Sequence, residues 1–216
     1  MPTSRVLVVE HHPLMREGLR LASSFALPGA VVDQAASVAE AEQLIARTAG
    51  YQCCILDLLL PDSNGFSGLM AIQHRLGRTP IALFSDRDGP ILVSTAKALG
   101  AAGFILKSVS MDETVAILRR LLAGGTVFPS DAEPSLHAQE MTQRLSTLSA
   151  AQMRVLVALA DGRANKQIAR DLDVSEATVK AHLTAIFRKL GVVNRTQALL
   201  TLQPILGDIG TSATRQ

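Results

Sequence analysis

The chain has no tryptophan, one tyrosine and only two cysteines, and none of its apolar runs is as long as a membrane helix. Because such a helix takes about 20 consecutive apolar residues, a membrane protein of the helical class is excluded. Cys53 and Cys54 are adjacent in an apolar segment without metal-ligating neighbours, so we expect free core thiols. The first residues, MPTSRVLVVEHHP, lack the layout of a signal peptide, and we expect a cytoplasmic protein.

What the sequence has instead is aliphatic residues and an uneven distribution of charge. Its 216 residues are 48% hydrophobic and 3% aromatic, enough for one or two domains with cores of Leu, Ala, Val and Ile. Residues 1–125 contain 11 basic and 11 acidic side chains. Residues 148–202 contain 8 basic and 4 acidic ones. The positive excess of the second segment favours a polyanionic partner there.

The stretch SEATVKAHLTAIFRKL, residues 175–190, has the period of an amphipathic helix. Its expected buried stripe contains Val179, Leu183, Ile186, Phe187 and Leu190. The opposite side is small and then cationic, with Ala177, Ala181, Thr184 and Arg188, and Lys180 on its flank. A second amphipathic helix is expected over residues 165–172, followed by a tight turn at 173–174 and an N-cap at Ser175. The pattern predicts a helix-turn-helix, although a helical hairpin with a solvated charged face would have the same periodicity.

The first part of the chain alternates between apolar strands and amphipathic helices. Strands are expected at residues 5–10, 30–35, 53–58, 80–85 and 103–106. Helices are expected at residues 13–26, 37–48, 90–100 and 110–122. One further helix follows the third strand and its loop and ends at about residue 76. Near-continuous apolar strands that alternate with helices indicate a parallel sheet covered on both faces.

Polar side chains follow the predicted strands at their carboxyl ends. Glu10 and His11 follow the first strand, and Asp57, Ser85 and Lys107 follow the third, fourth and fifth. The carboxyl ends of parallel strands meet at one edge, where such sheets bind ligands. A carboxylate near a hydroxyl and an ammonium suits an acyl-phosphate site, with Asp57 as nucleophile. The alternative is that Asp57 and Ser85 only cap the following helices.

Residues 124–145 interrupt the pattern with Gly124-Gly125, Pro129 and Pro134, and we expect a linker there, with a possible helix at 137–145. Beyond it, a helix is expected at 149–161, begun by a capping box of Ser149 and Gln152. A last helix is expected at 194–202.

The segment from Leu148 to Leu200, with its words NKQIA, SEATVKAHL, IFRKLGV and NRTQA, resembles the LuxR-type DNA-binding domain. The resemblance implies that Lys180, Ala181 and Thr184 contact bases. It implies that the last helix supports dimerisation on DNA. It also implies phosphate contacts from Asn165, Lys166, Ser175, Thr178 and Arg188.

The segments VLVVEHHPLMREGL, LDLLLPDSNGFSGL and GAAGFILKSVS resemble the receiver domain of NarL/FixJ-type response regulators. This resemblance implies a flavodoxin-like five-stranded parallel sheet, a sensor histidine kinase as a possible partner, and a dimer contact on either the first and last helices or the last two strands and helices. It implies that Asp57 is the phosphoacceptor, Ser85 the switch hydroxyl, Phe104 the switch aromatic residue and Lys107 the pocket lysine. The expected domains are a receiver at 1–123, a linker at 124–145 and an all-α helix-turn-helix domain at 146–216.

One departure from the receiver pattern concerns the metal. Receivers have two adjacent carboxylates after the first strand, which hold Mg²⁺ together with the acceptor aspartate, and this chain has Glu10-His11 instead. Mg²⁺ prefers octahedral oxygen ligands and is poorly served by imidazole. Asp86, which follows Ser85, adds a negative charge that should repel a phosphoryl group. We therefore expect impaired or absent Mg²⁺-dependent phosphorylation and no required cofactor, the alternative being a weak Mg²⁺ site on Glu10 and Asp57.

The sequence thus predicts a homodimeric DNA-binding transcription regulator that is not an enzyme and is controlled through its receiver. One alternative is a conventional response regulator that is activated by phosphorylation. Another, from a different class, is a protein-interaction or phosphate-buffering module that binds little DNA.

Overall fold

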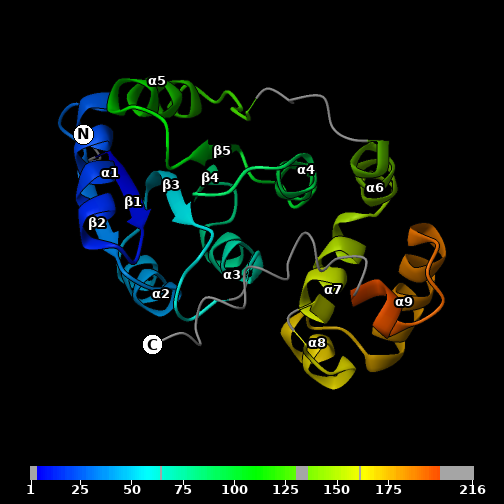
Figure 1. Ribbon diagram of the computed structural model, residues 1–216. Coiled ribbons are helices and arrows are strands. Elements are labelled where there is room, and N and C mark those ends of the chain that lie inside the picture. The colour runs from blue at the N-terminus through cyan, green and yellow to red at the C-terminus, as the bar shows by residue number, and fades with distance from the viewer. Residues whose placement is uncertain (1–3, 64, 130–135, 161, 200–216) are drawn as a thin grey trace, which may run out of the picture. The chain divides into compact units, whose positions relative to one another are not determined.

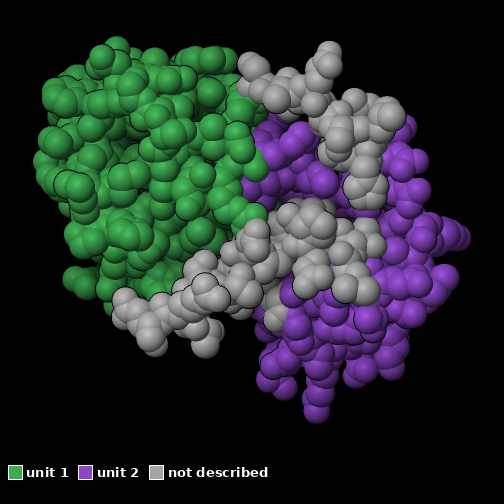
Figure 2. All heavy atoms as spheres, viewed as in Figure 1, with its two compact units in different colours: residues 1–88, 100–130 green, residues 89–99, 131–216 purple. Residues whose placement is uncertain are grey.

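The chain forms two compact units, shown in Figures 1 and 2, in a computed structural model that describes residues 4–63, 65–129, 136–160 and 162–199. The first unit contains residues 1–88 and 100–130, and the second contains 89–99 and 131–216. The division into domains at residues 123 and 145 stays a prediction. The compact units differ from it because residues 89–99 group with the second unit.

The first unit is built on a five-stranded parallel sheet, as the sequence predicted. Its strands are β1 (Arg5–Val9), β2 (Val31–Ala35), β3 (Tyr51–Asp57), β4 (Ile81–Ser85) and β5 (Gly103–Leu106). They lie in the order β2-β1-β3-β4-β5, which is the flavodoxin-like order. Nearly all residues of β1, β3 and β4 are buried, which explains why these strands are apolar without alternation.

Two pairs of helices cover this sheet. The helices are α1 (Pro13–Ala26), α2 (Val38–Arg47), α3 (Ser67–Leu76) and α5 (Met111–Leu122). Helix α1 packs against α5 and α2 against α3, with the strands between the two pairs in Figure 1. The hydroxyls of Ser37 and Ser110 cap α2 and α5 by accepting hydrogen bonds from backbone N–H groups.

Cys53 and Cys54 lie in β3 as buried free thiols, which confirms that prediction. Burial raises the pKa of Cys53 to about 12 and raises the pKa of Cys54 well above its ordinary value. Among the residues that the structure describes, no helix has the length and apolar character required to cross a membrane.

The second unit is helical. It contains α4 (Pro90–Ala98), α6 (Leu136–Ser146), α7 (Ala150–Ala160), α8 (Asn165–Asp171) and α9 (Glu176–Leu190). Helix α4 packs against α6, while α6, α7 and α8 all contact α9. The capping box before α7 is present, because Ser149 and Gln152 each accept a hydrogen bond from the other's backbone N–H.

Helices α8 and α9 form the predicted helix-turn-helix. Asp173 in the turn has a φ of 52°, a left-handed conformation that aspartate tolerates better than most residues. In α9, Val179, Leu183, Ile186 and Leu190 are buried, and Phe187, the fifth residue of the predicted stripe, is half-buried. Residues 195–199 are helical, and the rest of the last predicted helix lies outside the described residues.

Candidate functional site

The carboxyl edge of the sheet in the first unit brings four charged or polar side chains together. We call Glu10, His11, Asp57 and Lys107 the carboxylate pocket. Glu10 and His11 directly follow β1, Asp57 ends β3, and Lys107 directly follows β5. Since the strands are parallel, these chain positions share one edge, as the sequence predicted.

Lys107 and His11 bind the two buried carboxylates from different directions. Lys107 Nζ lies 2.8 Å from Glu10 Oε2 and 3.0 Å from Asp57 Oδ1. His11 Nδ1 lies 2.8 Å from Asp57 Oδ2 and 3.3 Å from Glu10 Oε1. An ionised carboxylate only accepts hydrogen bonds, so the contact with Asp57 places the hydrogen on Nδ1. Asp57 is therefore held between an imidazole and an ammonium.

The charge of Lys107 is maintained by its carboxylate partners. Burial favours the neutral amine, but hydrogen bonds and charge attraction from Glu10 and Asp57 outweigh it and raise the pKa of Lys107. Lys107 is thus an ammonium at neutral pH. Glu10 and Asp57 are 0% and 2% exposed, so this ammonium is needed to stabilise two buried negative charges.

The carboxylate pocket does not fit the Mg²⁺ ion that receivers use. Glu10 Oε1 accepts a hydrogen bond from the backbone N–H of His12 at 2.8 Å, and Asp57 Oδ1 accepts one from the N–H of Leu59 at 3.1 Å. Together with the Lys107 and His11 contacts, every oxygen of the two carboxylates has a nitrogen within 3.1 Å. Mg²⁺ requires near-octahedral oxygen ligands, whereas an imidazole stands where a further carboxylate would be needed.

The other predicted receiver residues lie apart from these contacts. Ser85 is buried, and its hydroxyl accepts a hydrogen bond from the backbone N–H of Arg87 at 3.0 Å. Phe104 is buried in β5, and Asp86 is exposed. The roles of these three residues stay predictions.

Two residues that were not predicted as site residues organise the β1–α1 connection. His12 lies beside Glu10, with its Nδ1 3.8 Å from Glu10 Oε1. The guanidinium of Arg16 donates hydrogen bonds to the carbonyl oxygens of Glu10 and His11 at 2.7 and 3.2 Å. The adjacent histidines in EHHP were the sequence signal that could have identified His12 as a site residue. No local pattern indicates that Arg16, within a helix, contacts the preceding loop.

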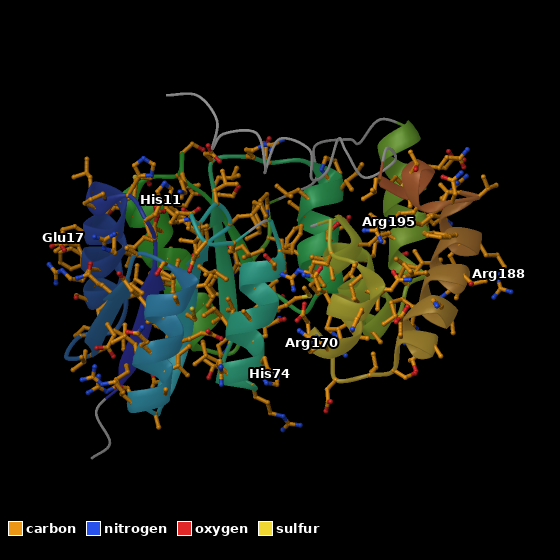
Figure 3. The ribbon with its side chains drawn as sticks, turned by 90° about the horizontal axis from the view of Figure 1, so that it is seen from below. His11, Glu17, His74, Arg170, Arg188 and Arg195 are labelled. Atoms are coloured by element: carbon orange, nitrogen blue, oxygen red, sulfur yellow. The ribbon has the colours of Figure 1, made fainter. Side chains whose placement is uncertain are left out.

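The second candidate site is the outward side of the helix-turn-helix. We call Lys180, Ala181, Thr184 and Arg188 the α9 face, and all four are exposed. Arg188 projects away from the helix in Figure 3, and Lys180 forms an ion pair with Glu176, one turn earlier on the same helix, at 3.3 Å. This arrangement leaves the α9 face available to a macromolecular partner of the second unit.

The residues predicted to contact phosphates are also at the surface. Lys166, Ser175 and Thr178 are exposed, and Asn165 is half-exposed. The Ser175 hydroxyl caps α9 by accepting a hydrogen bond from the N–H of Thr178 at 3.0 Å. Negative groups are stabilised at such a helix N-terminus, where backbone N–H groups point outward.

Not every basic residue of this segment faces outward. Lys189 Nζ donates hydrogen bonds to the Thr147 carbonyl and the Gln152 side chain at 2.6 and 2.8 Å. Arg195 donates to the Leu159 and Arg163 carbonyls. These two cations join parts of the second unit, so the net charge of the segment overstates the charge it can offer to a partner.

Two family descriptions match the chain. "Response regulator receiver domain" matches residues 6–119, which is more than half of the sequence. "Bacterial regulatory proteins, luxR family" matches residues 146–202. The chain belongs to the response regulator family. It is a DNA-binding response regulator of the LuxR/NarL type, which agrees with both predicted resemblances.

Relatives of this response regulator align along most of its length. The "Glycerol metabolism activator" of Pseudomonas putida is 32% identical over 97% of each chain. The "Nitrate/nitrite response regulator protein NarL" of Escherichia coli K12 is 29% identical, over 89% of this chain and 92% of its own. Such relatives are transcription regulators rather than enzymes, as predicted.

Solved structures support the fold. RcsB from Salmonella enterica serovar Typhimurium, bound to promoter rprA in the presence of phosphomimetic BeF3-, has a TM-score of 0.60 at 20% identity. The match covers 93% of this chain and 98% of that chain. At this identity the likeness concerns the fold alone.

Proposed function

We propose that this response regulator binds double-stranded DNA as a homodimer and regulates transcription without Mg²⁺-dependent phosphorylation of Asp57. The observation that carries the proposal is the 2.8 Å contact between His11 Nδ1 and Asp57 Oδ2. This contact occupies one oxygen of Asp57, the predicted phosphoacceptor, and the imidazole stands at the chain position where receivers have a second carboxylate. A sensor histidine kinase is not required by this mechanism, and a cytoplasmic location follows from access to bacterial DNA.

The chemistry of phosphoryl transfer explains why this contact matters. A metal ion offsets the negative charge that gathers between an attacking carboxylate and an incoming phosphoryl group. In the carboxylate pocket, Asp57 accepts hydrogen bonds from His11 and Leu59 and contacts Lys107. These partners stabilise the carboxylate and make it a weaker nucleophile, and Asp86, which is exposed and directly follows Ser85, adds a negative charge. Phosphorylation therefore lacks the electrostatic assistance that a metal ion would give.

The α9 face supports the DNA-binding part of the proposal. Its small residue Ala181 permits close approach to a duplex, while Lys180 and Arg188 are long enough to reach base edges or phosphates. RcsB, which has the same fold, is bound to promoter DNA in its structure. We assign base contacts to Lys180, Ala181 and Thr184. Phosphate contacts are assigned to Asn165, Lys166, Ser175, Thr178 and Arg188.

Replacing Lys180 with alanine is expected to lower the affinity for specific DNA by about 1–3 kcal/mol, because a base-contacting cation is lost. Specific fragments are first selected from genomic DNA with the full-length protein, without any phosphodonor. Fluorescence anisotropy then measures affinity at two salt concentrations. The matched control, Lys166→Ala, should weaken specific and non-specific binding alike. Because one phosphate contact is lost, the slope of log affinity against log salt concentration should become shallower by about one unit.

Unchanged specific affinity of Lys180→Ala would remove Lys180 from the base-contacting residues. If the unmodified protein bound no fragment at either salt concentration, the interaction-module alternative would replace the DNA-binding proposal.

A stripe of exposed apolar residues supports dimerisation through α1 and α5. Leu14, Leu21 and Phe25 follow one another at helical spacing on α1 and are 84%, 38% and 59% exposed. Met111 at the start of α5 is also exposed. Exposed apolar stripes of this kind typically mark protein contacts. Of the two receiver surfaces that the resemblance left open, we assign the dimer contact to this one.

The same surface is connected to the carboxylate pocket. A hollow of about 140 Å³ lies between α1 and α5, and its lining includes Leu14, Met111, Phe84 and Lys107. Lys107 thus reaches both the buried carboxylates and the hollow beside the apolar stripe. A change in the pocket can therefore alter the dimer surface through a single side chain.

Replacing Leu14 with glutamate is expected to weaken dimerisation at least about tenfold, because a charge would be placed in an apolar contact. Sedimentation analysis across a range of protein concentrations gives the dimer dissociation constant. His74→Glu on α3 is the control, since His74 is exposed and the variant adds the same side chain to the other helix layer. Equal dissociation constants for Leu14→Glu and the unmodified protein would contradict the assigned surface.

A further inference from the structure

We propose that Glu10, His11 and His12 form a binding site for a divalent transition metal, with Zn²⁺ as the representative ion. This site shares Glu10 and His11 with the carboxylate pocket, which does not fit Mg²⁺, and adds His12. The evidence for it involves neither DNA binding nor phosphorylation, and it gives the adjacent histidines of the β1–α1 connection a chemical role.

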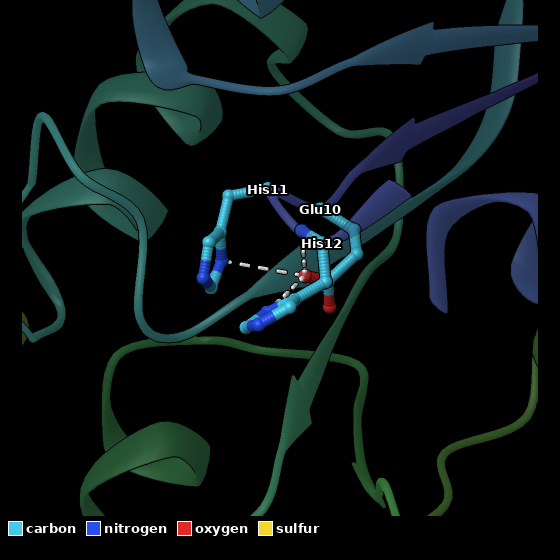
Figure 4. A group of neighbouring side chains, drawn as sticks. All are labelled: Glu10, His11 and His12. Atoms are coloured by element: carbon cyan, nitrogen blue, oxygen red, sulfur yellow. Dashed lines mark hydrogen bonds and ion pairs between the residues drawn. The ribbon is translucent and has the colours of Figure 1, made fainter. Parts of the chain in front are cut away.

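The donor atoms of these three side chains already have the spacing of ligands around one ion. Glu10 Oε1 is 3.3 Å from His11 Nδ1 and 3.8 Å from His12 Nδ1, and one donor atom from each residue lies within 4.8 Å of the others. With metal–ligand bonds of about 2.0–2.2 Å and tetrahedral angles, ligand atoms are about 3.3–3.6 Å apart. Figure 4 shows both imidazoles turned toward the Glu10 carboxylate. Small side-chain rotations would therefore bring all three atoms onto one ion.

The site combines a fixed carboxylate with accessible imidazoles. Glu10 is fully buried, and its other oxygen, Oε2, is held by Lys107 at 2.8 Å. Arg16 fixes the backbone by donating hydrogen bonds to the carbonyls of Glu10 and His11. The side chains of His11 and His12 are 34% and 66% exposed, so an ion and the water that completes its coordination can enter from solvent. Such outer contacts orient metal ligands and raise affinity.

The ligand types determine which ion is favoured. Imidazole nitrogen suits Zn²⁺, Ni²⁺, Co²⁺ and Cu²⁺, whereas Mg²⁺ selects oxygen. The charges of Glu10, Asp57 and Lys107 together leave one negative charge beside the site, which attracts a cation. Cys53 and Cys54 do not compete for the ion, because they are buried and their raised pKa values keep the thiols protonated.

Metal binding has a direct consequence for Asp57, the predicted phosphoacceptor. His11 Nδ1 donates its hydrogen to Asp57 in the metal-free pocket, and the same nitrogen is the proposed ligand. When the ion binds to Nδ1, that nitrogen gives up its proton to solvent, Nε2 carries the single hydrogen of the neutral ring, taken up from solvent where it is not already there, and the His11–Asp57 hydrogen bond is lost. The metal-bound state and the hydrogen-bonded state of Asp57 are therefore mutually exclusive.

The test is a titration of chelator-treated full-length protein with Zn²⁺ alone, by calorimetry and by equilibrium dialysis with metal analysis. We expect one Zn²⁺ per chain with a dissociation constant of about 1 μM or lower. His11→Ala and His12→Ala should each weaken binding about tenfold or more. His74→Ala is the matched control, because His74 is an exposed histidine of the same unit on α3 and should leave binding unchanged. Millimolar Mg²⁺ should not displace the ion.

Co²⁺ is a second probe, because four- or five-coordinate Co²⁺ has a visible absorption band that reports its coordination. We expect this band in the unmodified protein and its loss in His11→Ala and His12→Ala. Circular dichroism establishes that each variant is folded. Absence of stoichiometric Zn²⁺ binding, or equal affinities for the unmodified protein, His11→Ala and His12→Ala, would overturn the proposal. Because neither DNA nor phosphodonor is present, this result does not depend on the outcome of the tests of the proposed function.

Discussion

Replacing His11 with aspartate is expected to raise the affinity of this response regulator for Mg²⁺ about 100-fold, or about 2.8 kcal/mol. The variant removes the imidazole that holds Asp57 Oδ2 and adds a carboxylate beside Glu10 and Asp57. Three carboxylates provide the oxygen ligands that Mg²⁺ prefers. The same variant should allow rapid phosphorylation of Asp57 by a small phosphodonor in the presence of Mg²⁺.

Calorimetry measures the Mg²⁺ affinity, and intact mass measures the phosphorylated fraction over time. Quenching of tryptophan fluorescence cannot replace them, because the chain has no tryptophan. The control is His11→Asn, which removes the imidazole without adding a charge. Its Mg²⁺ affinity should stay close to that of the unmodified protein. Equal gains in His11→Asp and His11→Asn, or no gain in either, would show that His11 does not determine the metal preference.

Replacing Lys107 with methionine is expected to destabilise the first unit by about 3–5 kcal/mol, the usual cost of removing one partner from a buried ion pair. Methionine keeps most of the apolar length of lysine, so packing changes little. The buried carboxylates of Glu10 and Asp57, however, lose the ammonium that lies 2.8 and 3.0 Å from them. His11 continues to contact Asp57, while the Glu10 oxygen that faces Lys107 loses its ion-pair partner.

Urea unfolding measures the loss of stability, and the sequence provides a spectroscopic probe that is selective for the first unit. Tyr51, the single tyrosine, lies buried in β3 of the first unit, so its fluorescence reports the unfolding of that unit. Arg120→Met, at an exposed position of α5, is the control and should cost less than about 0.5 kcal/mol. Asp57→Asn in the Lys107→Met background should recover part of the loss, because one buried charge is removed. A loss below about 1 kcal/mol for Lys107→Met would contradict the assigned role of the ion pairs.

The convergence of the pocket residues was predictable because it follows from chain position. Strand ends in a parallel sheet share an edge, so the sequence alone predicts that Glu10, Asp57 and Lys107 meet there. The capping box of Ser149 and Gln152 was predictable for a similar reason, since both residues lie within one turn. Local patterns are sufficient where the structure depends on backbone geometry alone.

Side-chain direction was not predictable in the same way. Nothing in the letters EHHP specifies that His11 Nδ1 turns toward Asp57, which lies 46 residues away, or that His12 turns toward Glu10. Lys189 and Arg195 turn into the second unit, where they donate hydrogen bonds to backbone carbonyls of residues distant in the sequence. The packing of α4 against α6 likewise joins segments that share no local pattern.

The most direct test of the account is intact mass and DNA affinity measured on one sample of unmodified protein after incubation with a small phosphodonor and Mg²⁺. We expect that Asp57 stays essentially unmodified, that specific DNA is bound before treatment, and that the affinity changes less than about threefold, below the usual range of allosteric coupling. Rapid stoichiometric phosphorylation of Asp57, accompanied by a large gain in DNA affinity, would contradict it and establish a conventional phosphorylation-activated regulator.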